Sequence, residues 1–269
     1  MSSTSGDDVT GAEPIRYRPT AQSPTVVLVH GGTFTSRMWD GVREHLRSPS
    51  LAVDLPGRRY KPADLGVVKR QDWVDSVICD IQKEGLSDVV LVGHSSGGYV
   101  IPGVATGLGA GERARVRSLV FVAATVPAEG KRPVDFLRPD LRTLAVETTD
   151  VVILSAKGRT LGGFEEDEHP VETNFEIVEN GPRMGLEAPG PLFDSFSWKG
   201  FPSHLPRYFV RCTRDKVIPP ELVEVMIDNM GGATVIDLYA GHSAARTHPQ
   251  ALAAAIDQCV ESTVAQGWG

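Results

Sequence analysis

An apolar run and a turn of small residues meet in the stretch Asp88-Val89-Val90-Leu91-Val92-Gly93-His94-Ser95-Ser96-Gly97-Gly98. The run predicts a buried strand, and the pattern Gly-x-Ser-x-Gly that follows predicts a sharp turn from strand into helix. Such a turn holds its serine in strained backbone geometry with the hydroxyl pointing outward, while the glycines let neighbouring chain pass close by. Ser95 is therefore our first candidate for a chemically active residue.

Short β-branched runs alternate with longer helical patterns on both sides of this stretch, which is typical of a parallel sheet with crossover helices. The other strands are predicted at 25–30, 51–55, 116–123, 207–212 and 234–239. Helices are predicted at 38–46, 71–84, 96–108, 220–230 and 249–265. We therefore expect an α/β fold with a mostly parallel, doubly wound sheet.

Two segments depart from this alternation. Residues 1–24 are rich in Ser, Thr, Gly and Asp and lack an apolar run, so we expect a disordered tail and no secretory signal. Between residues 127 and 206 the sequence is irregular and rich in Pro and Gly, and it is too long for a loop inside a compact sheet. We expect a main domain of residues 25–127 and 205–266, with residues 128–204 inserted as a cap or lid.

The composition limits the partners of this chain. Its 269 residues are 41% hydrophobic, enough for a large core, and carry a net charge of −7 without a long basic run. We therefore expect neither nucleic acid nor a membrane as a partner, and no apolar stretch is long enough to span a bilayer.

Cys79, Cys212 and Cys259 lack metal-ligand spacing, which predicts reduced core residues in a cytoplasmic protein. Nothing decides the oligomeric state, and a homodimer is one option.

A serine hydroxyl needs a base to take its proton and a carboxylate to hold that base in the right tautomer. His242 follows the last predicted strand, and Asp215 follows the strand before it. Because the carboxyl ends of parallel strands share one edge of a sheet, Ser95, Asp215 and His242 are expected to meet there. The sequence thus predicts a catalytic Ser-His-Asp set.

Other acidic residues could take the role of the orienting acid. Glu129 is the rival acid, but it lies several residues beyond the strand predicted at 116–123. Asp54 also ends a strand, and we expect it to cap the following turn. The run Glu165-Glu166-Asp167-Glu168 beside His169 could suggest a metal, but consecutive carboxylates rarely converge on one ion, so a solvated surface is expected. No metal or other cofactor is expected.

Two backbone N–H groups should stabilise a developing oxyanion. Ser96 begins the predicted helix after Ser95, so its N–H points outward with a favourable dipole. The second donor should come from His30-Gly31-Gly32-Thr33, where we assign Gly32 and keep Thr33 as the alternative. Residues that could line a pocket for a small-molecule substrate are Thr33, Phe34, Trp39 and Tyr99, although each type is also common in ordinary cores.

These motifs resemble those of the α/β-hydrolase superfamily, and more narrowly its branch of plant methylesterases and hydroxynitrile lyases, as a bacterial-type esterase. The first two matching stretches are Val26-Val27-Leu28-Val29-His30-Gly31-Gly32 and Val90–Gly98. The others are Phe121–Pro127, Cys212–Pro219 and Gly241–Ser243. The resemblance implies Ser95 as nucleophile, His242 as base and Asp215 as orienting acid. It also implies Gly32 and Ser96 as oxyanion donors, and it leaves the insertion uncovered.

Two positions depart from the lyases. Those enzymes carry a lysine just after the catalytic histidine and a threonine after the first-strand histidine, where this chain has Ser243 and Gly31. Without an ammonium group for departing cyanide, hydrolysis of a small ester, thioester or lactone is favoured. A C–C bond hydrolase, cyclase or lyase using the same residues is the alternative, and a non-enzymatic ligand-binding module is disfavoured by the intact set.

Overall fold

The computed structural model describes residues 23–109, 114–137, 139–147, 187–218 and 220–266. Within these residues the strands form a parallel sheet in the order β2-β1-β3-β4-β5-β6. Their bounds are β1 Thr25–Val29, β2 Ser50–Val53, β3 Asp88–His94, β4 Arg115–Val122, β5 Arg207–Cys212 and β6 Thr234–Leu238. The predicted α/β class is confirmed.

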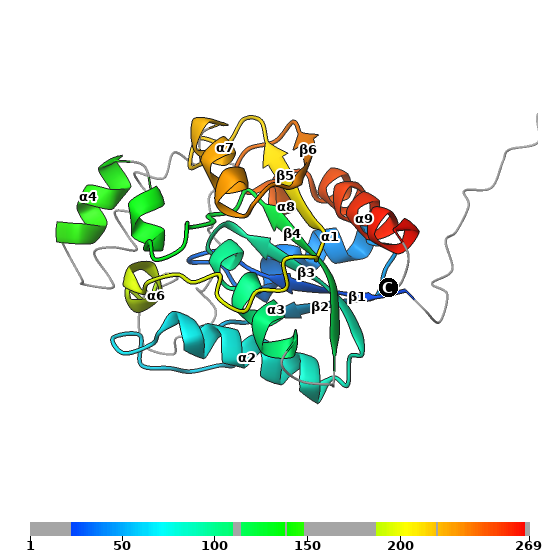
Figure 1. The fold of residues 1–269 in the computed structure, drawn as a ribbon, viewed down its shortest axis with the longest axis horizontal. Helices are drawn as coiled ribbons and strands as arrows, with labels where there is room; N and C mark the ends of the chain where they lie inside the picture. The colour runs from blue at the N-terminus through cyan, green and yellow to red at the C-terminus, as the bar shows by residue number, and fades with distance from the viewer. Residues whose placement is uncertain (1–22, 110–113, 138, 148–186, 219, 267–269) are drawn as a thin grey trace, which may run out of the picture.

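Helices cover both faces of this sheet (Figure 1). One face is packed by α2 Arg70–Lys83, α3 Ile101–Gly109 and α7 Pro220–Asn229. The other is packed by η1 Ser36–Trp39, α1 Asp40–His45, α8 Ala244–Thr247 and α9 Pro249–Ala265. None of the helices in the described part of the chain is long and apolar enough to cross a lipid bilayer.

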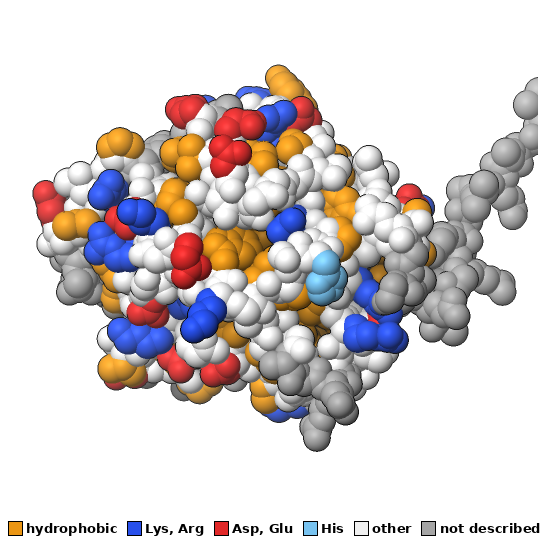
Figure 2. Space-filling model, viewed as in Figure 1, with side chains coloured by type: hydrophobic (Ala, Val, Ile, Leu, Met, Phe, Trp, Pro, Cys, Tyr) orange, Lys and Arg blue, Asp and Glu red, His pale blue; other side chains and the backbone are white. Residues whose placement is uncertain are grey.

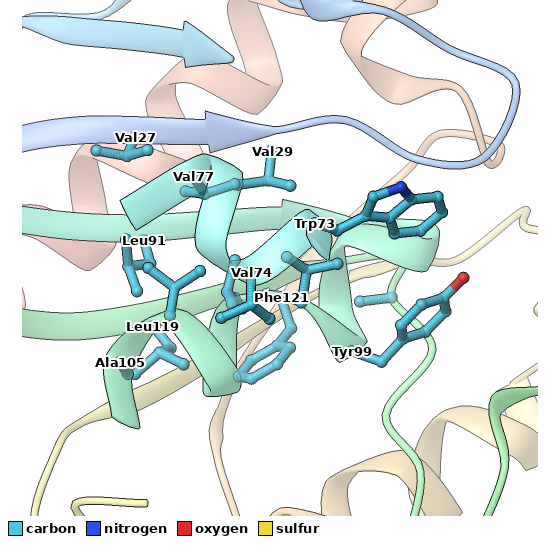
Figure 3. Packing of buried hydrophobic residues seen from close by; sticks show 14 of the residues in the cluster. Val27, Val29, Trp73, Val74, Val77, Leu91, Tyr99, Ala105, Leu119 and Phe121 are labelled. Carbon is cyan, nitrogen blue, oxygen red and sulfur yellow. The ribbon is translucent and has the colours of Figure 1, made fainter. Parts of the chain in front are cut away.

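The central strands are mostly apolar because both of their faces are buried along most of their length. Successive side chains of a strand point to opposite faces, so Val27 and Val29 pack with α2 and α3 while Val26 and Leu28 pack with α1 and α9. Figure 3 shows the first of these clusters, in which Trp73 lies over the end of the valine-rich layer. The sheet is therefore a rigid base from which loops emerge at the carboxyl ends of the strands.

The helix predicted at 96–108 is broken in two. A 3-10 helix, η2 Ser95–Tyr99, comes first, and α3 starts only at Ile101. Glycine is a poor helix former, and Pro102 lacks an N–H group but fits the first turn of a new helix. The small residues at 97 and 98 and this proline explain the break.

One cysteine prediction is wrong. Cys212 and Cys259 are buried, but Cys79 is exposed, and all three are free thiols. Residue 79 lies two positions after Val77 on α2, which turns it by about 200° away from the buried stripe of the helix.

The described part of the insertion lies between β4 and β5. It contains η3 Pro133–Phe136, α4 Pro139–Glu147 and α6 Gly190–Phe193, which share a small apolar cluster around Val134. Figure 1 shows these helices beyond the carboxyl ends of the strands. The division into main domain and cap stays a prediction, and the tail 1–22 and the acidic run 165–168 with His169 lie outside the described residues.

Candidate active site

The strand order reverses between β1 and β3. From β1 the chain continues to β2 on one side of it, and then crosses to β3 on the other side. Loops leaving neighbouring strands in opposite directions open a crevice at their carboxyl ends, where α/β sheets bind ligands. The loop after β1 and the turn after β3 therefore lie next to each other at this end of the sheet, where a Cβ at Gly31 would be 2.8 Å from Ser95 Cβ.

Ser95 occupies the turn at the end of β3 with a backbone φ of 51°, a conformation that is uncommon for a residue other than glycine. The turn also requires a glycine at 97, because a Cβ there would lie 2.8 Å from the carbonyl oxygen of Val29. The N–H of Thr125 donates to the Ser95 carbonyl oxygen at 3.0 Å, which ties the turn to the end of β4. The strained serine predicted from the motif is present in the structure.

His242 lies between the two other predicted residues. Its Nε2 is 3.0 Å from Ser95 Oγ, and its Nδ1 is 2.8 Å from Asp215 Oδ2. The other carboxylate oxygen, Oδ1, accepts the N–H groups of Val217 and Ile218 at 2.7 and 2.9 Å. Because a carboxylate oxygen accepts, His242 Nδ1–H donates to Asp215, and Nε2 is the ring nitrogen that faces the serine hydroxyl. The loops after β3, β5 and β6 thus bring the three residues together.

His94 holds the backbone of His242 in place. Its Nε2–H donates to the carbonyl oxygen of His242 at 2.9 Å, and its ring contacts the edges of Phe34 and Trp39. Burial holds the pKa of His94 well below its usual value, so the ring is neutral. Phe34 and Trp39 are fully buried in the second core cluster, so the structure shows them as packing residues, and their pocket role stays a prediction.

His30 fixes the loop after β1. Its Nδ1–H donates to the carbonyl oxygen of Gly31 at 2.8 Å, and its Nε2 accepts the N–H of Leu55 at 3.1 Å. Burial, and after it the nearby charge of Arg58, lowers the pKa of His30 to about 4. A neutral histidine therefore connects this loop to the end of β2.

A buried ion pair lies over the same loop, and the sequence does not predict it. Arg58 Nη2 donates to Glu187 Oε2 at 2.9 Å, and Arg58 Nε donates to the carbonyl oxygen of Phe34 at 3.1 Å. The same carboxylate oxygen accepts the N–H of Thr33 at 2.7 Å. Glu187 belongs to the chain returning from the insertion, 129 positions after Arg58. No periodicity or spacing in the sequence connects two residues this far apart.

The rival acids lie elsewhere. Glu129 accepts hydrogen bonds from the Ser197 hydroxyl and the Trp198 N–H on the exposed surface. The expectation that Asp54 caps the following turn is wrong, because its Oδ1 instead accepts the N–H of Ser36, the first residue of η1, at 2.7 Å. The fold brings Asp54 next to an earlier segment, a contact that local sequence rules do not anticipate.

A hollow of about 610 Å³ opens at the opposite edge of the sheet, near Pro24, Arg115 and Pro206, where β1, β4 and β5 begin. Neither Ser95 nor His242 lines it. Among the described residues, no group of three or more His, Cys, Asp or Glu side chains is placed to hold a metal ion.

Comparison with known proteins extends these observations. The sequence model of the alpha/beta hydrolase family matches residues 26–255. Over 115 residues the chain is 36% identical to a carbendazim hydrolyzing esterase of Nocardioides sp. (strain SG-4G), covering 39% of this chain and 43% of that protein. Over 123 residues it is 32% identical to a protein of Arabidopsis thaliana assigned as chloroplastic methylesterase 14, covering 43% of this chain and 33% of that protein. Both matches span less than half the length of these relatives.

A solved structure is similar along almost its whole length. An extracellular alpha/beta-hydrolase from a Paenibacillus species, described as sharing structural and functional homology with tobacco salicylic acid binding protein 2, superposes with a TM-score of 0.73. The match covers 87% of this chain and 98% of that one at 21% identity, so it shows the fold alone. The resemblance to methylesterases is confirmed by the plant relative. Since the family model spans residues 26–255, from β1 into α9, the chain belongs to the alpha/beta hydrolase family.

Proposed function

We propose that this protein is a serine hydrolase that cleaves a small carboxylic ester, thioester or lactone through an acyl-enzyme on Ser95. The observation that carries the proposal is the continuous hydrogen-bonded chain from Asp215 through His242 to Ser95, with distances of 2.8 and 3.0 Å. The names of the esterase relatives support the same reaction class.

The geometry suits a proton transfer from the serine. As Ser95 Oγ attacks the carbonyl carbon, its proton passes to His242 Nε2, and the imidazolium that forms is held by Asp215. Asp215 keeps its orientation because its second oxygen is bound by two backbone N–H groups. His242 then gives the proton to the leaving group, and later activates the water that releases the acid.

The oxyanion would be bound by the N–H groups of Gly32 and Ser96. Ser96 is the second residue of η2, and the first N–H groups of a helix have no carbonyl partner within it. Thr33, the alternative donor, already gives its N–H to Glu187. This contact favours Gly32 for the second donor.

Two positions favour hydrolysis over cyanohydrin cleavage. Ser243, where the related lyases carry lysine, is fully buried and starts the short helix α8, so no ammonium group extends from it. At Gly31, where those enzymes carry threonine, a Cβ would lie 2.8 Å from Ser95 Cβ. A threonine at position 31 therefore does not fit this backbone, and no lysine is present at position 243.

Replacement of the nucleophile tests the proposal. We expect Ser95→Ala to lower the rate of p-nitrophenyl acetate and butyrate hydrolysis by at least about 1,000-fold, because no acyl-enzyme can form. Labelling by a fluorophosphonate probe should be lost in the same variant. Ser87→Ala, an exposed serine just before β3, is the matched control and should keep the parental rate. A Ser95→Ala protein that hydrolyses these esters at the parental rate would refute the proposal.

A further inference from the structure

Three buried polar side chains, those of Arg58, Ser96 and Tyr99, each have an atom that lacks a partner. The exposed fractions are 1% for Arg58, 8% for Ser96 and 1% for Tyr99. Arg58 Nη1, Ser96 Oγ and the Tyr99 hydroxyl have no hydrogen bond of ordinary geometry to any of the residues that the structure describes. Buried polar groups are costly unless they are paired, so several of them in one place indicate a ligand that supplies the missing partner.

These atoms belong to one cluster. A Cβ built on Gly32 would lie 2.7 Å from Glu187 Oε2 and 3.5 Å from Ser96 Oγ, so both groups lie against this glycine. Ser96 and Tyr99 lie three positions apart in the 3-10 helix η2, a spacing that puts their side chains on the same side. Arg58 donates to the Glu187 oxygen that lies against Gly32. Burial and, after it, the charge of Glu187 raise the pKa of Tyr99. The Tyr99 and Ser96 hydroxyls can form one hydrogen bond with each other. One hydroxyl proton and Arg58 Nη1 would then still lack an acceptor.

The ring of Tyr99 is held in place. It stacks on Trp73 with the ring centroids 6.3 Å apart and the planes 13° apart. Figure 3 shows the two rings side by side at the end of the apolar cluster, with the phenol oxygen directed away from the valine side chains. Such stacking presents the hydroxyl without a loss of side-chain freedom on binding.

The charge of the cluster determines what it can accept. The Arg58 guanidinium is already balanced by Glu187 at 2.9 Å, and Tyr99 stays protonated because its pKa is raised. A carboxylate in this place would be a buried charge without a counter-ion. Arg58 Nη1 can only donate, and the two hydroxyls can donate as well as accept, so a neutral acceptor oxygen suits all three.

We propose that Arg58, Ser96 and Tyr99 form a polar subsite that binds a neutral oxygen atom of the acyl group, in an ether, hydroxyl or keto function close to the reacting carbonyl. The subsite adjoins Gly32 and Ser96, whose N–H groups are the proposed oxyanion donors, so the second oxygen lies within one or two carbons of the carbonyl. This inference rests on the proposed function and names the class of acyl group.

Two esters of equal size test the subsite. p-Nitrophenyl methoxyacetate and p-nitrophenyl butyrate differ only by an oxygen in place of a methylene, and the ratio of their kcat/KM values measures recognition of that oxygen. We expect Tyr99→Phe and Ser96→Ala each to lower this ratio by about fivefold relative to the parent, the effect of one neutral hydrogen bond. Comparison of ratios between variants cancels the intrinsic reactivity of the two esters.

Tyr208→Phe is the matched control. Tyr208 is also buried, but its hydroxyl contacts Thr263 and Gln266 on the other face of the sheet, so the ratio should not change. The inference is overturned if both site variants keep the parental ratio, or lower both rates equally, while hydrolysis remains dependent on Ser95. If Ser95→Ala retains full hydrolysis, the proposed function fails instead. Should Tyr99→Phe not fold, Ser96→Ala decides alone.

Discussion

Gly31 carries no side chain at a point where two site residues leave no room for one. A Cβ at this position would lie 2.6 Å from His94 Nδ1 and 2.8 Å from Ser95 Cβ, both shorter than real Cβ contacts. Both the serine and the histidine, or the loop at Gly31 itself, would have to move. Since His94 in turn holds the backbone of His242, the displacement would reach the proposed base as well.

We therefore expect Gly31→Ala to lower kcat/KM by roughly 10- to 100-fold through misplacement of Ser95. The clash should also lower the free energy of unfolding by about 1–3 kcal/mol. Gly109→Ala is the control, because a Cβ at the end of α3 meets no atom within 4 Å. Ester kinetics and thermal unfolding of both variants check this, and an active, fully stable Gly31→Ala protein would contradict it.

His30 should make stability dependent on pH. In the unfolded chain its imidazole takes up a proton near pH 6.5, but in the fold only near pH 4. Between these two pH values the unfolded state binds more protons than the folded state. The contribution of His30 to the free energy of unfolding is therefore complete above about pH 6.5 and is lost as the pH falls to about 4. The loss from His30 amounts to about 3 kcal/mol.

Urea unfolding at several pH values between 4 and 7 measures this dependence. We expect the plot of unfolding free energy against pH to have a slope smaller by about one proton in His30→Asn than in the parent. Equal slopes in the parent and in His30→Asn would show that His30 does not titrate as expected.

At the scale of elements, one ion pair joins the loop after β1 to the chain that returns from the insertion. Arg58 donates to the carbonyl oxygen of Phe34, and Glu187 accepts the N–H of Thr33. The ion pair therefore fixes the loop backbone at both of these positions. Thr33 has a backbone φ of 62°, a strained conformation that such contacts maintain.

Glu187→Ala should destabilise the protein by about 3–5 kcal/mol, because it leaves a buried guanidinium without its counter-ion. Glu224→Ala removes an exposed partner of Arg211 and should cost no more than about 1 kcal/mol. Denaturant unfolding of the two variants provides the comparison. Equal losses in both would mean that burial of the Arg58 pair has no energetic consequence.

The sequence predicts those elements whose pattern is local. The bounds of β5 and α9 agree with the structure to the residue, because an apolar run and a regular helical stripe depend only on neighbouring positions. The positions of Ser95, Asp215 and His242 at strand ends also follow from the pattern, although their catalytic roles stay predictions. The bond from His94 to the His242 carbonyl joins residues 148 positions apart and depends on tertiary packing, so no local rule finds it.

At the scale of the whole molecule, the distribution of thiols offers a test of the native packing. Cys79 is exposed, whereas Cys212 and Cys259 are buried, and burial raises the pKa of the Cys259 thiol to about 12. We expect one thiol per chain to react rapidly with a disulfide reagent in the native state, and all three in denaturant. Cys79→Ser should abolish the fast phase. Rapid reaction of two or three native thiols would contradict the packing described here.

The surface seen in Figure 2 carries acidic and basic side chains interspersed with each other. On this face, the acidic side chains behind the net charge of −7 therefore do not form a single acidic patch. The expectation that the chain has no anionic partner such as nucleic acid remains a prediction.

The three residues of the proposed site come from β3, β5 and β6, with Ser95 lying 147 positions before His242. During synthesis, the ribosome delivers the serine early, together with the strands at the middle of the sheet. His242, the proposed base, arrives only when the last strand has left the exit tunnel and docked at the edge of the sheet. A nascent or prematurely terminated chain would thus already hold the nucleophile and still be chemically silent, so that hydrolysis begins only with the complete sheet.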